Sequence, residues 1–181
     1  MRVDAAGVLP GVRFVASPNH DERPAGEAVV LVVLHGISLP PGRFGGSDIE
    51  RLFTNTLDPA ADAYYAGLAE LRVSAHFVVR RRGEIVQFVA CERRAWHAGA
   101  SQWNGRSRCN DFSVGIELEG ADEVPYAAAQ YRAVAKLVAA LQVRYPIAAI
   151  VGHSDVAPGR KTDPGPAFDW PRFRAQLARC R

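Results

Sequence analysis

The sequence has few lysines and cysteines, a single methionine and no long apolar run. Of its 181 residues, 22 are Lys or Arg, and only Lys136 and Lys161 are lysines. The longest apolar run, residues 28–34, is far shorter than the roughly 20 residues that a membrane-spanning helix needs. Residues 1–7 contain no apolar segment of the kind that a secretory signal carries. We therefore expect no interaction with a membrane and no secretory leader.

The three cysteines are scattered singly, with no CxxC pair: Cys91, Cys109 and Cys180. An odd, unpatterned set indicates free thiols in a reducing compartment rather than a disulfide framework. We expect a cytoplasmic protein, although a chain whose leader had been removed would look the same. A composition of 48% hydrophobic and 23% charged residues excludes a disordered or collagen-like chain.

The formal net charge is +3, and the basic excess is concentrated in one segment. Residues 72–108 contain eight arginines against Glu84 and Glu92. One interpretation is a solvated, hairpin-rich face. The alternative is a site for an anionic ligand, because arginine binds carboxylates through two parallel hydrogen bonds. A positive charge also occurs in nucleic-acid binders, but nothing else in the sequence favours that class.

The sequence shows no repeat, low-complexity tract or linker, which predicts a single domain over residues 1–181 with residues 1–27 as an N-terminal extension packed on it. Apolar patterning predicts strands at 28–34, 112–118 and 147–151, a hairpin of 73–79 with 84–89, and helices at 48–57, 60–71 and 127–145, with a last helix capped by Asp169. This order lacks a regular βαβ alternation. It predicts an α/β fold of the α+β type, with a mixed central sheet flanked by helices.

Two histidines share one context, which makes them candidate metal ligands. His35 and His153 each directly follow an apolar strand and each adjoin a glycine. Asp163 comes ten residues after His153. Two imidazoles and one carboxylate leave a fourth tetrahedral position for water, as in catalytic zinc sites. The alternative is that each histidine is structural, since the sequence has no compact metal-binding motif.

Two further charged residues are candidates for catalysis. Glu117 lies on the polar face of the alternating strand 112–118, where it is either solvent-facing or a general base. Lys161 precedes Asp163 by two residues and is either a loop cation in water or a group that stabilises a developing oxyanion. The other three histidines, His20, His76 and His97, receive no firm role from their spacing.

Six segments, in this order, carry a resemblance to a known family. They are Val33 to Pro41, Arg72 to His76, Arg94 to Gly99, Cys109 to Ser113, Gly115 to Gly120 and Gly152 to Trp170. Together these segments resemble the AmpD-type amidases, the 1,6-anhydro-N-acetylmuramyl-L-alanine amidases of cytoplasmic cell-wall recycling, and they span nearly the whole chain. The family shares its fold with peptidoglycan recognition proteins: a mixed sheet flanked by helices, with zinc in a surface cleft.

The resemblance implies a role for each candidate. It makes His35, His153 and Asp163 the ligands of one Zn²⁺ ion, Glu117 the general base and Lys161 the stabiliser of the transition state. It also implies that Arg72 and Arg108 hold carboxylates of the substrate peptide, while Ala95 and Trp96 line its groove. The implied substrate is an anhydromuropeptide, cut between the lactyl group and L-alanine, with no nucleic acid, membrane or obligate protein partner.

One position departs from the family pattern: Gly36 stands where the family commonly has Asn. An Asn amide near the metal would hydrogen-bond to the substrate, so its loss predicts weaker or altered substrate contact. Two alternatives to the recycling enzyme remain open at the level of sequence. One is a periplasmic amidase acting on intact murein, and the other is a peptidoglycan-binding module without catalysis.

Overall fold

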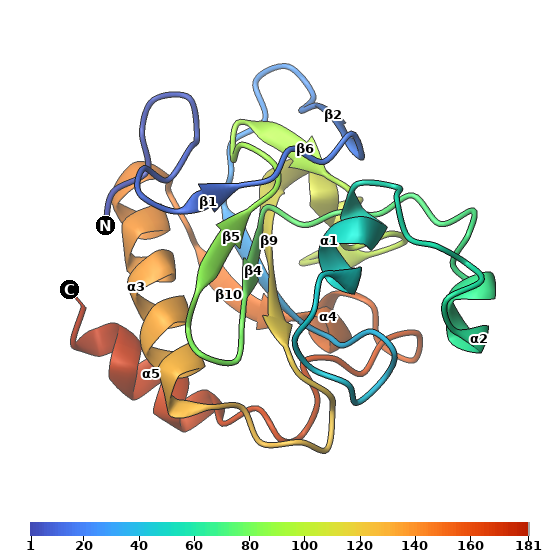
Figure 1. The fold of residues 1–181 in the computed structure, drawn as a ribbon. Helices are drawn as coiled ribbons and strands as arrows, with labels where there is room; N and C mark the ends of the chain where they lie inside the picture. Colours follow the sequence, from blue (N-terminus) through green and yellow to red (C-terminus); the bar gives the residue numbers. More distant parts are fainter. Residues whose placement is uncertain (181) are drawn as a thin grey trace.

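A six-stranded mixed sheet forms the centre of the computed structural model, which describes residues 1–180 (Figure 1). The strand order is β1-β5-β4-β9-β3-β10, in which β4 and β5 pair antiparallel and the other neighbours pair parallel. The strands are β1 Arg13–Phe14, β3 Leu31–Ile37, β4 Phe77–Val79, β5 Ile85–Gln87, β9 Ser113–Glu119 and β10 Ala149–Gly152. The predicted mixed sheet flanked by helices is confirmed.

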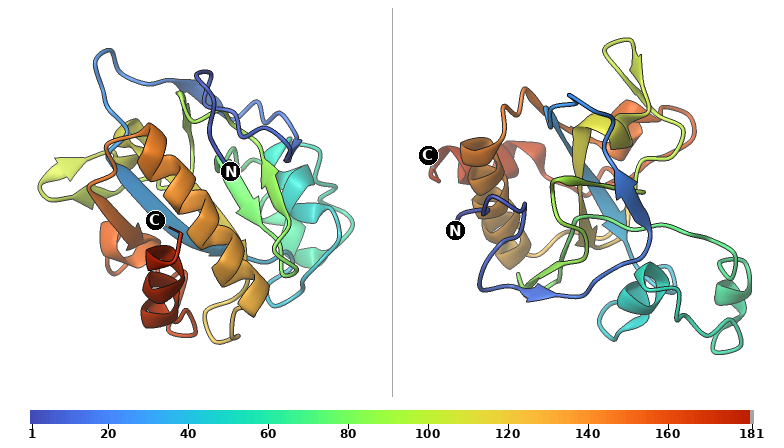
Figure 2. Two further views of the ribbon diagram at one scale, coloured as in Figure 1. Left: turned by 90° about the vertical axis from the view of Figure 1, so that its left-hand side faces the viewer. Right: turned by 90° about the horizontal axis from the view of Figure 1, so that it is seen from above.

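Helices cover both faces of this sheet. On one face lie α3 (Ala128–Arg144) and α5 (Trp170–Ala178), and on the other lie α1 (Asp48–Phe53) and α2 (Ala63–Ala66) (Figure 2). The remaining elements are two short ribbons, β2 (His20–Glu22) with β6 (Arg93–Ala95) and β7 (Gln102–Trp103) with β8 (Arg106–Ser107), the 3₁₀ helix η1 (Cys109–Phe112) and α4 (His153–Val156). No helix among residues 1–180 is long and apolar enough to cross a bilayer.

The alternation of β9 separates a packed face from a functional one. Val114, Ile116 and Leu118 point into the main apolar core, where they meet α3 and α5. Successive side chains of a strand lie on opposite faces, so Ser113, Gly115 and Glu117 lie on the face away from α3. The predicted division of this strand into an apolar and a polar face is therefore confirmed.

The central strand differs from its predicted range. The apolar pattern predicts a strand over residues 28–34, but β3 runs from Leu31 to Ile37. The strand extends past the apolar run because Ile37 still pairs with Glu119 of β9, and the backbone ladder does not depend on the side chain of His35 or Gly36. His35 is consequently a residue within the central strand rather than one that follows it.

The two helices predicted at 48–57 and 60–71 are shorter in the structure. Helix α1 ends before Asn55, which adopts the left-handed conformation (φ 59°) and closes the helix with a bond from Thr56 N to Arg51 O. Helix α2 begins at its cap Asp62, and beyond Gly67 the chain continues in turns. The hairpin, α3 and α5 lie where they were predicted, with the strands of the hairpin shortened to β4 and β5.

The segment before β3 lies against the sheet. Strand β1 pairs with β5, and the backbone N–H of Leu9 donates to the buried Gln87 side chain at 2.8 Å. The N–H of Ser17 donates to Phe88 O at 3.0 Å. The division of residues 1–181 into one domain with an extension over 1–27 stays a prediction, and Arg181 lies outside the described residues.

Candidate active site

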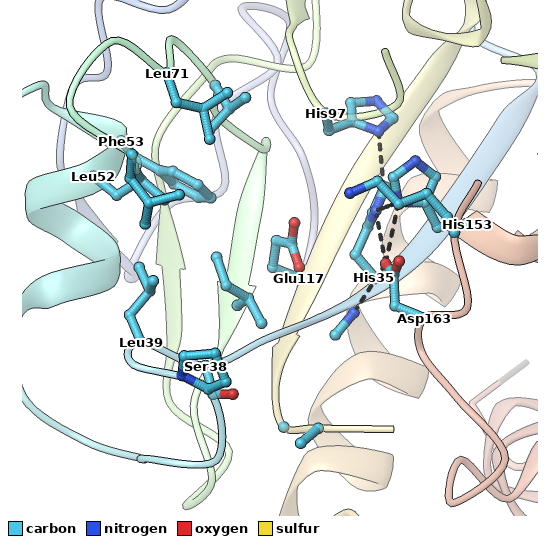
Figure 3. A pocket seen from close by; sticks show the side chains of 18 of the residues that line it. His35, Ser38, Leu39, Leu52, Phe53, Leu71, His97, Glu117, His153 and Asp163 are labelled. Carbon is cyan, nitrogen blue, oxygen red and sulfur yellow. Dashed lines mark hydrogen bonds and ion pairs between the residues drawn. The ribbon is translucent and has the colours of Figure 1, made fainter. Parts of the chain in front are cut away.

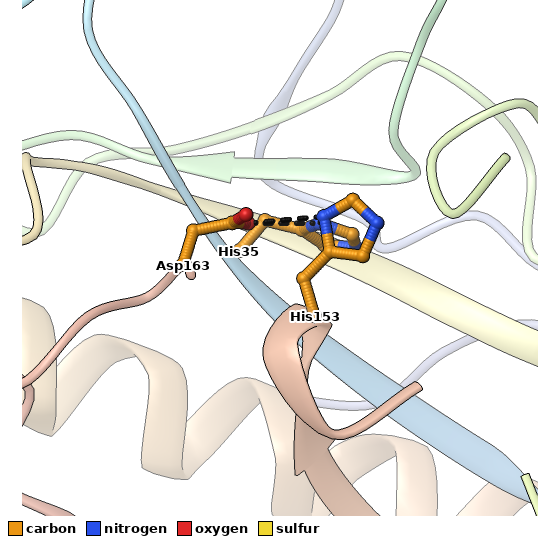
Figure 4. A group of neighbouring side chains, drawn as sticks. All are labelled: His35, His153 and Asp163. Carbon is orange, nitrogen blue, oxygen red and sulfur yellow. Dashed lines mark hydrogen bonds and ion pairs between the residues drawn. The ribbon is translucent and has the colours of Figure 1, made fainter. Parts of the chain in front are cut away.

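His35, His153 and Asp163 converge from three separate elements (Figure 4). His35 comes from the middle of β3, His153 begins α4, and Asp163 lies in the loop that follows. The Nδ1 atoms of the two histidines are 3.0 Å apart. Oδ2 of Asp163 lies 3.3 Å from Nδ1 of His35 and 3.1 Å from Nδ1 of His153. The tertiary fold thus brings the three predicted ligands into one small triangle.

The triangle fits a tetrahedral zinc ion. Zinc bonds of roughly 2.0–2.1 Å at tetrahedral angles place ligand atoms about 3.3 Å apart, close to the observed separations. Burial lowers the pKa of His35 to about 4, so its imidazole is neutral at neutral pH. Burial acts to raise the pKa of Asp163, but the contacts of its carboxylate with His153 and His35 outweigh burial and hold that pKa well below its usual range. Neutral imidazoles and a carboxylate are the forms that bind a divalent cation.

The loop that carries Asp163 is tied to the elements beside it. The N–H of Ser154 donates to Asp163 O at 3.0 Å, so the loop is fastened to the first turn of α4. The N–H of Gly152 donates to Asp155 Oδ2 at 2.7 Å, which fixes the turn from β10 into α4. Both candidate ligands on this side of the site are therefore held in place by hydrogen bonds that backbone N–H groups donate.

Glu117 lies beside the triangle on the same face of the sheet (Figure 3). Its side chain is partly exposed to a cavity, but its Oε2 atom is buried and finds no hydrogen-bond partner among residues 1–180. Desolvation raises the pKa of Glu117 well above its ordinary value; the charge of Asp163 adds to this, and that of Lys161 opposes it. An unpartnered carboxyl oxygen beside a candidate metal site indicates an acceptor for a proton or for water.

The cavity has a volume of about 450 Å³ and two unlike sides. The ligand triangle lies on one side, and the other side is apolar (Figure 3). Lys161 also lines the cavity. The apolar wall consists of Leu39, Leu52, Phe53, Leu68, Leu71 and Val73. Glu117 lies between the two, so a bound group would contact the apolar wall, the carboxyl group and the ligand triangle at once.

The four predicted substrate residues lie outside the lining of this cavity. Arg72 is exposed and donates to Ala69 O and Leu71 O, while Arg108 is exposed and paired with Asp111. Trp96 is half-buried, and its indole N–H donates to Asp21 Oδ1 at 3.1 Å. Ala95, the last residue of β6, is fully buried in the core, so its side chain presents no surface.

The basic segment 72–108 is largely neutralised by residues from elsewhere in the chain. Five of its eight arginines form ion pairs with acidic side chains: Arg80, Arg93, Arg94, Arg106 and Arg108. Their partners include Asp21, Glu22, Glu27, Glu50, Asp111 and Glu119. The local excess seen in the sequence is therefore no measure of the free positive charge on this face.

The three histidines left without a firm role by the sequence lie in different environments in the structure. His20 lies on the short strand β2 at intermediate exposure, and His76 is buried, with its Nδ1 accepting from the N–H of Gly115 at 3.0 Å. His97 is buried against His35, at 2.9 Å between their ring nitrogens, and lines the cavity. The residue pattern offered one indirect signal for the position of His97, which is Gly115 in the predicted strand. A glycine inside a strand indicates that another group approaches the backbone closely, and here that group is the His97 ring.

Gly36 faces away from the cavity's carboxyl group and toward Tyr126. A Cβ atom at residue 36 would lie 2.5 Å from the Tyr126 hydroxyl oxygen, which itself donates to Pro164 O at 2.9 Å. A side chain at this position therefore requires the phenol to move. We therefore expect a side chain at residue 36 to disturb the packing beside Asp163 rather than to contact a substrate directly.

Known proteins share both the sequence and the fold of this chain. Residues 25–166 match the family described as N-acetylmuramoyl-L-alanine amidase. The chain is 57% identical over 175 residues to the 1,6-anhydro-N-acetylmuramyl-L-alanine amidase AmpD of Escherichia coli (strain K12), covering 96% of each chain. A crystal structure of an AmpD derivative matches with a TM-score of 0.95 at 57% identity, over 98% of this chain and 99% of that chain.

A more distant match is the Escherichia coli amidase AmiD, solved in complex with anhydro-N-acetylmuramic acid-L-Ala-D-γ-Glu-L-Lys. It has a TM-score of 0.60 at 30% identity, over 87% of this chain and 65% of that chain. Sequence, fold and the gathered side chains agree with the resemblance found in the sequence. The chain belongs to the N-acetylmuramoyl-L-alanine amidase family.

Proposed function

We propose that the protein hydrolyses the amide bond between the lactyl group of 1,6-anhydro-N-acetylmuramic acid and L-alanine in muropeptides, as a cytoplasmic enzyme of peptidoglycan recycling. The observation that carries the proposal is the unpartnered Oε2 of Glu117 beside a triangle of His35, His153 and Asp163. The similarity to AmpD over 96% of the chain supports the anhydro substrate. The AmiD complex supports it too, since its ligand carries the same bond.

The metal in this proposal is zinc, held by Nδ1 of His35, Nδ1 of His153 and a carboxylate oxygen of Asp163. Zinc, when bound there, supplies a Lewis acid that polarises the scissile carbonyl group and acidifies the attacking water. The spacing of the three ligand atoms and the protonation states of their side chains support the assignment. The two nitrogen ligands and the single carboxylate leave room for water and substrate.

Glu117 is the general base and then the general acid. Its carboxylate takes a proton from water as the water oxygen attacks the lactyl carbonyl carbon. The C–N bond then breaks, and the protonated carboxyl returns the proton to the amine of L-alanine. The raised pKa of Glu117 suits both steps, because it brings the proton affinity of the group closer to neutral pH.

Lys161 stabilises the negative charge that develops on the carbonyl oxygen. It lines the cavity that also contains Glu117, and its ammonium group acts on the pKa of that carboxyl. A positive charge aimed at the site of a developing oxyanion favours the transition state more than the ground state.

The peptide part of the substrate carries carboxylates, and Arg72 and Arg108 are our proposed partners for them. Arg72 is exposed and forms no ion pair among residues 1–180, so its guanidinium is available. Arg108 would share its charge between Asp111 and the substrate. Trp96 would contact the peptide with the face of its indole ring, because its N–H already donates to Asp21. Ala95 would contribute only main-chain atoms, because its side chain is buried.

Mass spectrometry of the products tests the proposal. The purified protein is incubated with an anhydromuropeptide and, separately, with intact murein, each with and without a zinc chelator. We expect free peptide from the anhydromuropeptide, abolished by chelator and restored by added zinc. Release of peptide from intact murein at an equal rate would favour the alternative of a periplasmic amidase. Near-zero zinc in the purified protein, with no release of peptide from either substrate, would favour a binding module.

The compartment is tested separately, by fractionation of cells that express the chain from its natural gene. We expect the protein with the cytoplasmic marker, and we expect no nucleic acid, membrane or obligate protein partner to accompany it. Recovery with the periplasmic marker would overturn the cytoplasmic assignment and leave the chemistry unchanged.

A further inference from the structure

Both candidate histidine ligands have their second ring nitrogen against the same short segment. Nε2 of His35 lies 2.9 Å from Nδ1 of His97, and Nε2 of His153 lies 3.2 Å from the carbonyl oxygen of Ala98. His97 and Ala98 are consecutive residues in the loop after β6. One dipeptide therefore contacts the outer nitrogens of two ligands that are 118 residues apart in the chain.

The hydrogen-bond chain behind His35 has a defined direction. The Ser113 hydroxyl donates to Cys109 O at 2.6 Å, so its oxygen is left to accept from Nε2 of His97 at 3.1 Å. With its proton on Nε2, a neutral His97 can only accept at Nδ1. Nε2 of His35 must then be the donor, which leaves the lone pair of His35 on Nδ1, the atom that faces Asp163.

The same logic holds for His153 in one step. Nε2 of His153 lies 3.2 Å from Ala98 O, which only accepts, and 3.5 Å from the Arg160 guanidinium, which only donates. The shorter contact to the carbonyl oxygen assigns the proton to Nε2 of His153. Its lone pair is then on Nδ1, which faces Asp163 at 3.1 Å. Both chains end on a backbone carbonyl group, and both assign the proton to the nitrogen that points away from the ligand triangle.

The dipeptide is itself held from three sides. Oδ1 of Asn110 accepts from the backbone N–H groups of His97 (3.2 Å) and Ala98 (2.8 Å). The guanidinium of Arg160 donates to Ala98 O at 2.6 Å. The ring of His97 lies over Gly115, where a Cβ atom would come within 2.4 Å of its Cγ. The position of His97 thus depends on the missing side chain at residue 115.

We propose that His97 is a positioning residue that, with the carbonyl of Ala98, holds both histidine ligands in the tautomer that presents Nδ1 to the metal. Residues behind metal-ligating histidines commonly orient the ring and fix the tautomer in this way, and their loss costs roughly 10–100-fold in metal affinity. The inference rests on the zinc site of the proposed function, but its first readout does not require metal.

Two variants of His97 test it. Asn places a carboxamide oxygen near the former Nδ1 and still accepts from His35, whereas Leu keeps a similar volume and accepts nothing. A merely structural role would make both variants fail alike. We therefore compare His97→Asn, His97→Leu and the unaltered chain, with His20→Asn as a matched histidine replacement on a strand outside the cavity.

The first readout is the ¹⁵N NMR spectrum of the histidine side chains in metal-free protein. We expect the Nε2–H tautomer of His35 in the unaltered chain, in His97→Asn and in His20→Asn, and a mixture of tautomers in His97→Leu. The second readout is zinc affinity by competition with a chelator. We expect His97→Leu to lose about 10–100-fold and His97→Asn to lose only a few-fold.

Unchanged tautomer and zinc affinity in His97→Leu would overturn the proposal, and so would equal losses in the Asn and Leu variants. If His97→Leu fails to fold, Ser113→Ala carries the same test. It removes the acceptor of the His97 Nε2–H, and we expect it to populate the other tautomer of His35. An unaltered chain that binds no zinc would refute the proposed function, while the NMR comparison would still decide the role of His97.

Discussion

Glu117 is the direct register partner of His35 on the neighbouring parallel strand. The two side chains share one face of the sheet, so the backbone ladder of β3 and β9 sets the spacing between the candidate base and a candidate zinc ligand. Parallel pairing runs without interruption from Leu31 with Ser113 to Ile37 with Glu119. The strand pairing thus holds the two candidate groups side by side without any direct bond between them.

The first prediction concerns the proton carried by Glu117. We expect Glu117→Gln to bind zinc as the unaltered protein does, because the carboxyl group is not a member of the ligand triangle. We expect kcat to fall about 10²–10⁴-fold, the usual contribution of a positioned general base. Steady-state kinetics and metal analysis on the same preparation decide it, and an active Gln variant would remove the assigned role.

The same residue should make folding stability depend on pH. The pKa of Glu117 in the folded protein is raised well above the ordinary 4.5, so protonated Glu117 is favoured by folding. Its contribution to stability is complete below about pH 4.5 and is lost as the pH rises toward the folded pKa. In metal-free protein, we expect Glu117→Gln to gain stability over the unaltered chain between pH 4 and 7. Chemical denaturation at several pH values in that range measures the difference in unfolding free energy between the two proteins. A difference that does not change with pH would contradict the prediction.

Lys161 should affect the rate of the reaction and leave the metal in place. We expect Lys161→Ala to lower kcat about 10²–10³-fold, as the removal of one donor to an oxyanion does. The exposed loop position predicts little effect on stability. Lys136→Ala on α3, the other lysine of the chain, is the matched control. Equal activity of the two variants would show that Lys161 is a solvated loop cation.

Gly36→Asn should act through Tyr126. The new side chain must displace the phenol, whose hydroxyl oxygen would lie 2.5 Å from the added Cβ, and so break its hydrogen bond to Pro164. We expect a loss of about 1–3 kcal/mol in the free energy of unfolding, as for other overpacked sites. The loss should shrink in a Tyr126→Phe background, where the clashing oxygen is absent. A double-mutant cycle of unfolding free energies tests this coupling, and strict additivity would count against it.

Arg80 should stabilise the fold by pairing with a buried carboxylate. Its guanidinium lies 3.2 Å from Oε1 of Glu119, and both side chains are almost fully buried. Because Arg80→Met leaves Glu119 without this partner, we expect a loss of about 3–5 kcal/mol in the free energy of unfolding. Arg82→Met, two residues on and exposed, is the control and should change stability by less than about 0.5 kcal/mol. Similar denaturation midpoints for the two variants would refute the assignment.

Local pattern was sufficient for part of the fold. Strict alternation placed Glu117 on the face opposite Val114 and Ile116, and the capping residue Asp169 marked the start of α5. The ends of short elements were predicted less well. Strand β3 extends to Ile37 through pairing with β9, and α1 stops at a left-handed Asn55, and neither event is visible in the hydrophobic pattern. Backbone hydrogen bonds decided both ends, and such bonds form whatever the side chains are.

Part of the candidate site could likewise be predicted from the sequence, and part could not. The residue types and local context of His35, His153 and Asp163 are enough to indicate metal chemistry, and the resemblance of the chain to a family assigned the role of each. The role of His97 could not be predicted, because it depends on a contact with a residue 62 positions away in the chain and on the space above Gly115. The charge of the segment 72–108 could not be judged either, since its acidic partners lie in other parts of the chain.

The sequence by itself determined which side chains are available for chemistry and which face of each strand they occupy, because both follow from residue type and local periodicity. It also restricted lysine to two positions, one of them in the loop beside Asp163. Only the tertiary structure decided which of these groups meet. Strand register placed Glu117 beside His35, and long-range ion pairs neutralised four of the eight arginines in the segment 72–108. The loop after β6 placed His97 against His35. The physical reason is that these contacts join residues far apart in the chain, so their free energy is gained only when the whole sheet is assembled.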